Sequence, residues 1–167
     1  IHGTVLMFSV EDSINTTLLP RAMAAEADLE KFVFWYPATV SYPSTQKNLS
    51  HEPMIIQKIR DYPDVQLVLF DHFDLIYSGY PQTPYGRKSA LRALTNLARK
   101  QQFAVIANAH YSKSASRTGN PLDRIAGGNV IATTVRRIMY VEELTPHDLN
   151  NATRQFALFD TKLSING

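Results

Sequence analysis

The sequence predicts an α/β fold in which a predominantly parallel sheet is flanked by helices. Short, nearly continuous apolar runs recur at residues 4–10, 65–71 and 103–110. Such runs are typical of strands that are buried on both faces. Segments of helical composition lie between them, and this alternation indicates parallel strands covered by helices on both sides. We expect one domain spanning residues 1–167, because this length can bury a sizeable core.

The first half of the chain supplies the first three strands and two helices. The run at 4–10 is the first strand, and a segment of helical composition follows at 13–30, where Pro20 limits the start of the helix or kinks it. Residues 31–37 are aromatic and favour a strand. Residues 50–62 have a helical pattern, and the run at 65–71 is the third strand.

The second half begins with the clearest amphipathic helix, at residues 84–102. The run at 103–110 is a further strand, and a polar stretch at 111–128 has the composition of a long surface loop. Two more strands are expected at 136–143 and 154–162. The apolar stripe of the 84–102 helix consists of Ala90, Leu91, Leu94, Leu97 and Ala98.

Ligands of open parallel sheets bind beyond the carboxyl ends of the strands, so the residues that end each apolar run are the candidate site. Asp71 ends "LVLFD", where a carboxylate can hold a water of a Mg²⁺ shell beside a nucleotide, or can simply cap the next helix. Glu11 can polarise a water that attacks a γ-phosphate, or can merely begin a loop. His110 can contact a γ-phosphate, or can be a solvated histidine. The full set of strand-end residues is Glu11, Asp12, Asp71, His72, His110 and Lys162.

The middle of the chain is basic, although the net charge is only +2. From Arg87 to Arg137 there are ten basic residues and one acidic residue, Asp123. Lys113 and Arg117, in the polar stretch, could contact phosphates of a nucleotide or a nucleic acid, or could be solvated charges of a loop.

The order of these motifs resembles that of RecA-like ATPases, especially plasmid RepA-type hexameric helicases and DnaB-type replicative helicases. "VLMFSVED" is similar to the strand that ends in the catalytic glutamate, which gives that role to Glu11. "VQLVLFD" resembles the Walker B strand, which gives the magnesium role to Asp71. "AHYSK" resembles the sensor strand, which makes His110 the phosphate sensor and Lys113 its basic companion. Nucleotide binding is also implied for Asp12.

The same resemblance implies ATP and Mg²⁺ as ligands, single-stranded DNA as partner and a homo-oligomeric ring. "NPLDRIAGGNVI" is similar to a loop that faces DNA, so Lys113, Arg117 and Arg124 are the expected nucleic-acid contacts. "ALFDTKLSING" resembles the final strand, from which Lys162 would reach the nucleotide of the adjacent subunit. DnaB-type members carry Lys-x-Arg there, whereas this chain reads Lys162, Leu163, Ser164, with serine in place of the arginine.

A phosphate-binding motif of the form G-x-x-x-x-G-K-[ST] does not occur in the sequence. In the family this loop precedes the strand that corresponds to residues 4–10, so it would fall before Ile1. We therefore expect the complete protein to be an ATPase and this chain alone to bind ATP weakly and to be inactive.

Two other functions fit parts of the sequence. Asp71, His72, Asp74 and His110 offer carboxylate and imidazole ligands for a metal-dependent hydrolase. A RecA-like module without its phosphate loop could also bind DNA or protein without catalysis. The absence of cysteine excludes disulfides and zinc–thiolate sites and is compatible with the cytoplasm, and no apolar run reaches the roughly 18 residues of a membrane helix.

Overall fold

The computed structural model describes residues 3–36, 52–77, 83–110, 131, 134–143 and 156–163. The chain divides into two compact units, Ile1–His110 and Tyr111–Gly167. The expected loop at 111–128 lies outside the described residues.

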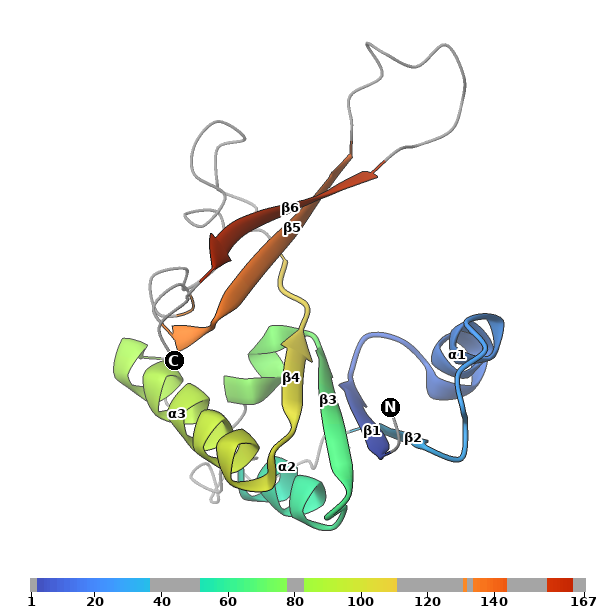
Figure 1. Ribbon diagram of the computed structural model, residues 1–167, viewed down its shortest axis with the longest axis horizontal. Coiled ribbons are helices and arrows are strands. Elements are labelled where there is room, and N and C mark those ends of the chain that lie inside the picture. Colours follow the sequence, from blue (N-terminus) through green and yellow to red (C-terminus); the bar gives the residue numbers. More distant parts are fainter. Residues whose placement is uncertain are drawn as a thin grey trace, which may run out of the picture. The chain divides into compact units, whose positions relative to one another are not determined.

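The first unit is built on a four-stranded sheet with the strand order β2-β1-β3-β4, and all neighbouring strands are parallel (Figure 1). The predicted parallel sheet is therefore confirmed. The register pairs Ser9 with Asp71 and Phe70 with Ala107, so the carboxyl ends of the three strands β1, β3 and β4 are nearly level. The strands are β1 (Thr4–Ser9), β2 (Phe32–Trp35), β3 (Val65–Asp71) and β4 (Ala104–Ala107).

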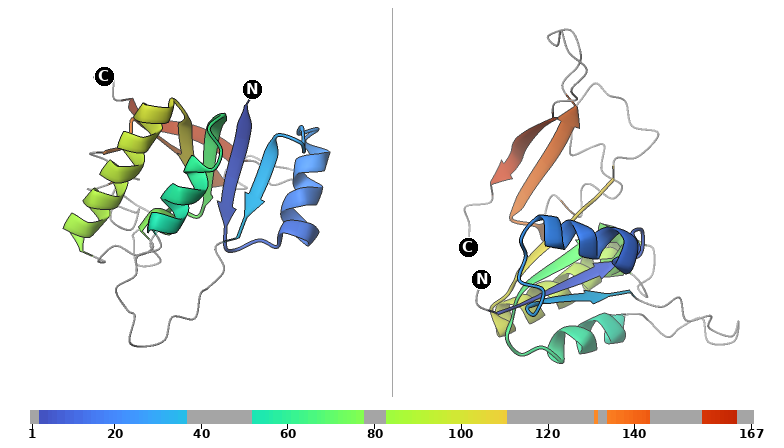
Figure 2. Two further views of the ribbon diagram at one scale, coloured as in Figure 1. Left: turned by 90° about the horizontal axis from the view of Figure 1, so that it is seen from below. Right: turned by 90° about the vertical axis from the view of Figure 1, so that its right-hand side faces the viewer.

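Helices connect the strands on both faces of this sheet. The chain passes from β1 to β2 in one direction and from β2 through β3 to β4 in the other. Right-handed crossovers therefore put α1 on one face and the other two helices on the opposite face, as Figure 2 shows. The helical elements are a π-helical turn (Ile14–Leu18), α1 (Leu19–Ala24), α2 (Glu52–Arg60), a 3₁₀ turn (Phe73–Tyr77) and α3 (Pro84–Gln101).

The longest helix, α3, begins and ends at residues suited to those positions. The Thr83 side chain accepts a hydrogen bond from the Gly86 N–H at 3.1 Å, and Pro84 occupies the first turn. Gln102 closes the helix in the left-handed conformation, with φ of 61°. The predicted apolar stripe is the buried face, with Ala98 half-buried and Ala90, Leu91, Leu94 and Leu97 buried.

The centre of the sheet is an aromatic and aliphatic core. The Phe8 ring is fully buried, stacks on Phe70 at 5.1 Å between centroids and meets the edge of Trp35 at the same distance. These contacts tie β1 to both of its neighbours, β2 and β3. The positions of the strand ends are therefore fixed by packing as well as by the hydrogen bonds of the ladders.

The second unit contains two strands that pair with each other in an antiparallel ladder, β5 (Arg137–Glu143) and β6 (Phe156–Leu163). The two strands predicted in this part of the sequence are thus confirmed. Within the described part of the chain, no helix combines the length and the apolar character that crossing a membrane requires.

Candidate functional site

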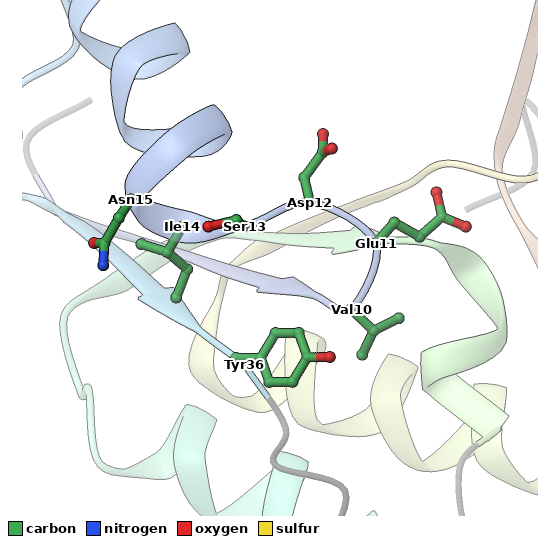
Figure 3. Close-up of a pocket in the computed structure, with 7 residues that line it drawn as sticks. All are labelled: Val10, Glu11, Asp12, Ser13, Ile14, Asn15 and Tyr36. Atoms are coloured by element: carbon green, nitrogen blue, oxygen red, sulfur yellow. The ribbon is translucent and has the colours of Figure 1, made fainter.

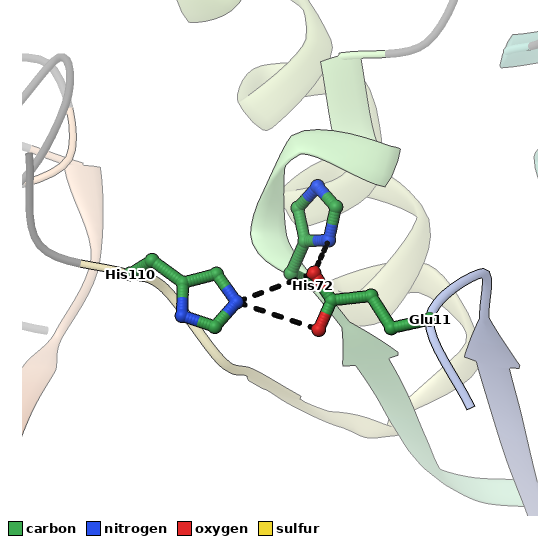
Figure 4. A group of neighbouring side chains, drawn as sticks. All are labelled: Glu11, His72 and His110. Atoms are coloured by element: carbon green, nitrogen blue, oxygen red, sulfur yellow. Dashed lines mark hydrogen bonds and ion pairs between the residues drawn. The ribbon is translucent and has the colours of Figure 1, made fainter.

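Three side chains that the sequence placed at separate strand ends meet at the carboxyl edge of the parallel sheet (Figure 4). Glu11 follows β1, His72 follows β3 and His110 follows β4. Because β3 lies between β1 and β4 in the sheet, the three segments leave it side by side. The predicted convergence of Glu11 and His110 at one edge is therefore observed.

The Glu11 carboxylate is the centre of this group. His72 Nδ1 lies 2.9 Å from Glu11 Oε1, and His110 Nε2 lies 3.3 Å from Oε1 and 3.4 Å from Oε2. The side chain of His72 is 26% exposed, that of Glu11 42% and that of His110 70%. The group therefore opens to solvent through His110 and is closed on the side of His72.

Asp71 lies beside this cluster and has a different partner. Asn108 Nδ2 donates a hydrogen bond of 3.0 Å to Asp71 Oδ1. The Asn108 main chain joins the same two segments, since its N–H donates to the Phe70 carbonyl at 3.0 Å and its carbonyl accepts from the Phe73 N–H at 2.6 Å. Asn108 thus orients the carboxylate that the sequence assigns to magnesium. Sequence reasoning missed this residue, although its position two residues before His110 was the available signal.

The turn that follows His72 is held in place by buried side chains. The peptide bond between Asp71 and His72 is cis, and the 3₁₀ turn Phe73–Tyr77 then packs its apolar side chains inward. The Tyr77 ring meets Phe73 edge to face at 5.2 Å, and the Arg87 guanidinium of α3 lies over it at 5.4 Å.

Burial of Tyr77 also changes its chemistry. Burial raises the pKa of Tyr77 to about 12, while the positive charge of Arg87 lowers it and the negative charge of Asp74 raises it further. The phenol therefore stays protonated throughout the physiological range. Its contribution at this edge of the sheet is packing.

Asp12 lies next to Glu11 in sequence but pairs with α1 and not with the two histidines. Its Oδ2 is 2.7 Å from Arg21 Nη1, and this pair links the end of β1 to α1. Figure 3 shows the Glu11 carboxylate directed away from Tyr36 and Ile14. A surface pocket of about 420 Å³ lies here, lined by Val10, Glu11, Asp12, Ser13, Ile14, Asn15 and Tyr36.

The remaining residues assigned from the sequence lie outside the described part of the first unit. Lys113, Arg117 and Arg124 lie outside the part of the chain that the structure describes. The backbone of Lys162 lies in β6 of the second unit, opposite Ile138 of β5. Their assigned roles stay predictions.

The expected metal-ligand set differs from the observed grouping. The sequence suggested Asp71, His72, Asp74 and His110, whereas the structure groups His72 and His110 with Glu11. The reason is the sheet order, which places β1 directly beside β3, while the Asp71 carboxylate accepts a hydrogen bond from Asn108.

Comparison with known proteins places the chain in a family. Residues 1–116 match the family described as AAA domain. A KaiC-like protein from the hyperthermophilic archaeon Pyrococcus horikoshii OT3 has a similar structure, with a TM-score of 0.57 and 13% sequence identity over 96% of this chain and 67% of that one. At this identity the likeness concerns the fold, which is RecA-like. No curated protein sequence matches the chain. From the family match and the fold together, the chain belongs to the AAA-domain family of RecA-like P-loop ATPases.

Proposed function

We propose that this chain forms the hydrolytic edge of an ATPase motor or switch of the RepA or DnaB type that acts on DNA. The observation that carries the proposal is the convergence of Glu11, Asp71 and His110 at the level carboxyl ends of three adjacent parallel strands. That edge is where open α/β sheets bind their ligands. ATP would supply the scissile γ-phosphate, and Mg²⁺ would neutralise charge on its oxygens.

Asp71 fits the role of a magnesium-side carboxylate on grounds of orientation. Its Oδ1 accepts the Asn108 amide hydrogen at 3.0 Å, which fixes the carboxylate plane and leaves Oδ2 to accept from a metal-bound water. Mg²⁺ usually keeps several waters and takes only one or two protein carboxylates. A single oriented aspartate at the end of β3 therefore suffices for this part of the site.

Glu11 fits the role of general base because a carboxylate there can accept a proton from an attacking water. His110 lies against it at the edge of the sheet, with its Nε2 at 3.3 and 3.4 Å from the two carboxylate oxygens. The side chain of His110 is 70% exposed, so it can contact a γ-phosphate before hydrolysis and lose that contact once the phosphate has left.

The phosphate cradle and the charges from a neighbouring subunit are further parts of this proposal. A glycine-rich phosphate loop does not occur in the sequence, and under this proposal residues other than 1–167 would supply its backbone N–H groups. Lys162 would approach the nucleotide of an adjacent ring subunit, and Lys113, Arg117 and Arg124 would contact single-stranded DNA. The family resemblance supports these roles, together with the basic block of the sequence.

The test is ATP hydrolysis by the natural gene product that carries this chain, with Glu11→Gln and Asp71→Asn as variants. Glu11→Gln keeps the size of the side chain and removes the base, so the turnover number should fall by about 10²- to 10⁴-fold with ATP binding retained. Asp71→Asn should weaken the Mg²⁺ dependence of hydrolysis. Glu30→Gln, which removes the same charge from an exposed position, is the matched control.

The outcomes separate the two main functions. Full hydrolysis by Glu11→Gln would remove Glu11 from the role of base. A natural protein that binds DNA but hydrolyses no ATP under any condition would favour the non-catalytic binding module instead.

A further inference from the structure

The group formed by Glu11, His72 and His110 has the composition and spacing of a transition-metal site. One ligand atom from each residue lies within 4.8 Å of the other two. Two of the three separations are 2.9 and 3.3 Å. A tetrahedral Zn²⁺ ion about 2.1 Å from each ligand sets its ligand atoms about 3.4 Å apart, which the 3.3 Å separation matches and the 2.9 Å separation would reach by opening about 0.5 Å. The third separation can close by rotation of His110, because its side chain is 70% exposed.

His72 is oriented as a metal-binding histidine would be. Its Nδ1 atom is buried and makes no hydrogen bond of acceptable geometry with the described residues, although Glu11 Oε1 lies only 2.9 Å away. Its other ring nitrogen, Nε2, faces Asp74 Oδ2 at 3.9 Å. Histidines that bind a metal through one nitrogen almost always present the other N–H to a carboxylate, a carbonyl or water. Asp74 would accept that N–H after moving about 1 Å closer than its present 3.9 Å.

The donor set also distinguishes this group from the magnesium site proposed at Asp71. Mg²⁺ prefers oxygen ligands and retains its waters, whereas two imidazoles and one carboxylate suit Zn²⁺ and its neighbours in the first transition row. Three protein ligands with a fourth position open to solvent are typical of zinc sites that keep a water molecule.

We propose that Glu11, His72 and His110 bind a Zn²⁺ ion, and that the bound ion switches off hydrolysis by engaging the Glu11 carboxylate. The second half of this statement rests on the proposed function, since it requires Glu11 to be the base. A carboxylate that coordinates Zn²⁺ is a poor proton acceptor, so one residue cannot serve both purposes at the same time. His72, which has no part in the proposed hydrolysis, would then be the residue that makes this ATPase sensitive to zinc.

The binding half is tested on the 167-residue chain by isothermal titration with Zn²⁺, supported by the visible absorption of Co²⁺ bound in its place. We expect one ion per chain. His72→Ala and His110→Ala should each weaken binding by more than about 100-fold, and Asp74→Asn, which alters only the orienting carboxylate, by about ten-fold. His147→Ala, which removes an imidazole at a distant position in the sequence, should bind as the original chain does. Circular dichroism shows whether each variant is folded.

Binding that is absent, or that His72→Ala and His110→Ala leave unchanged, overturns the metal site and identifies any bound zinc as adventitious. The regulatory half is measured as ATP hydrolysis by the natural gene product while Zn²⁺ is raised in the presence of excess Mg²⁺. Inhibition that disappears in His72→Ala supports it, and hydrolysis that saturating Zn²⁺ leaves unchanged overturns it. A protein that binds Zn²⁺ through His72 but hydrolyses no ATP even without zinc refutes the ATPase proposal and leaves the metal site standing.

Discussion

Replacing Tyr77 with phenylalanine tests the packing of the turn that follows Asp71 and His72 at the end of β3. The Tyr77 side chain is 1% exposed, and its hydroxyl makes no hydrogen bond within the described residues. Burial raises the pKa of Tyr77 from 10.0 to about 12, the charge of Arg87 lowers it and that of Asp74 raises it. The folded protein thus retains the phenol proton at a pH where the unfolded chain has lost it.

The sign of the effect on stability follows from this difference. Below pH 10 both states hold the proton, and the phenol adds no pH dependence. Between pH 10 and about 12 the unfolded chain releases the proton first, so the free energy of unfolding falls as the pH rises. Two pKa units at about 1.36 kcal/mol each give a loss of about 2.7 kcal/mol, against a total stability of roughly 5–15 kcal/mol.

The assay is urea unfolding of the original chain and of Tyr77→Phe at neutral pH and at steps from pH 10 to 12. At neutral pH Tyr77→Phe should be more stable than the original chain by about 1–3 kcal/mol, because it removes a buried hydroxyl that has no hydrogen bond within the described residues. Across the alkaline window the original chain should lose about 2.7 kcal/mol more than the variant. Tyr85→Phe, at a side chain that is 82% exposed, controls for the chemistry of the substitution. A stability difference that stays constant over the window would refute the assignment of a buried, proton-retaining phenol.

Three further changes test the core, the start of β1 and the site. Phe8→Ala should lower the free energy of unfolding by about 3–5 kcal/mol in urea titrations, because this fully buried ring packs against both neighbouring strands. Gly3→Ala should cost about 1–3 kcal/mol in the same assay, since an added Cβ would collide with the Asp64 carbonyl oxygen. Asn108→Ala should leave unfolding nearly unchanged and slow Mg²⁺-dependent ATP hydrolysis by about ten-fold, because the Asp71 carboxylate loses the amide that orients it.

The strands were predictable because a strand that is buried on both faces has a nearly continuous run of apolar residues. The run at 65–71 matches β3 (Val65–Asp71) residue for residue. The helix predicted at 84–102 from its apolar stripe matches α3 to within one residue. The helix expected at 13–30 ends earlier, at Ala24. Glu26 then has a positive φ of 54°, a backbone conformation that the hydrophobic pattern of the sequence does not predict for a glutamate.

The partners of the site residues were harder to predict, because they depend on which strands are neighbours. Sequence alone puts Glu11 and His72 after two different strands, and only the order β2-β1-β3-β4 brings their side chains to 2.9 Å. Asn108 escaped notice for a related reason. Its function depends on a lateral hydrogen bond to Asp71, and a polar residue after a strand carries no sign of what it will contact.

Both proposals about Glu11 depend on the same neighbouring strands. His72 is the residue whose role differs between them. As proposed, Asp71 oriented by Asn108 would offer an oxygen ligand that suits Mg²⁺, whereas Glu11 with the two histidines would form a nitrogen-rich site beside it. Hydrolysis as proposed uses Glu11 and His110 but has no need of a second imidazole. His72 is the least exposed of the three side chains, and its Nδ1 lies 2.9 Å from Glu11 Oε1, on the side where the proposed zinc would bind. Under these proposals, the chemistry of this edge depends on whether an ion binds through the Asp71 oxygen or through the imidazole nitrogens beside Glu11.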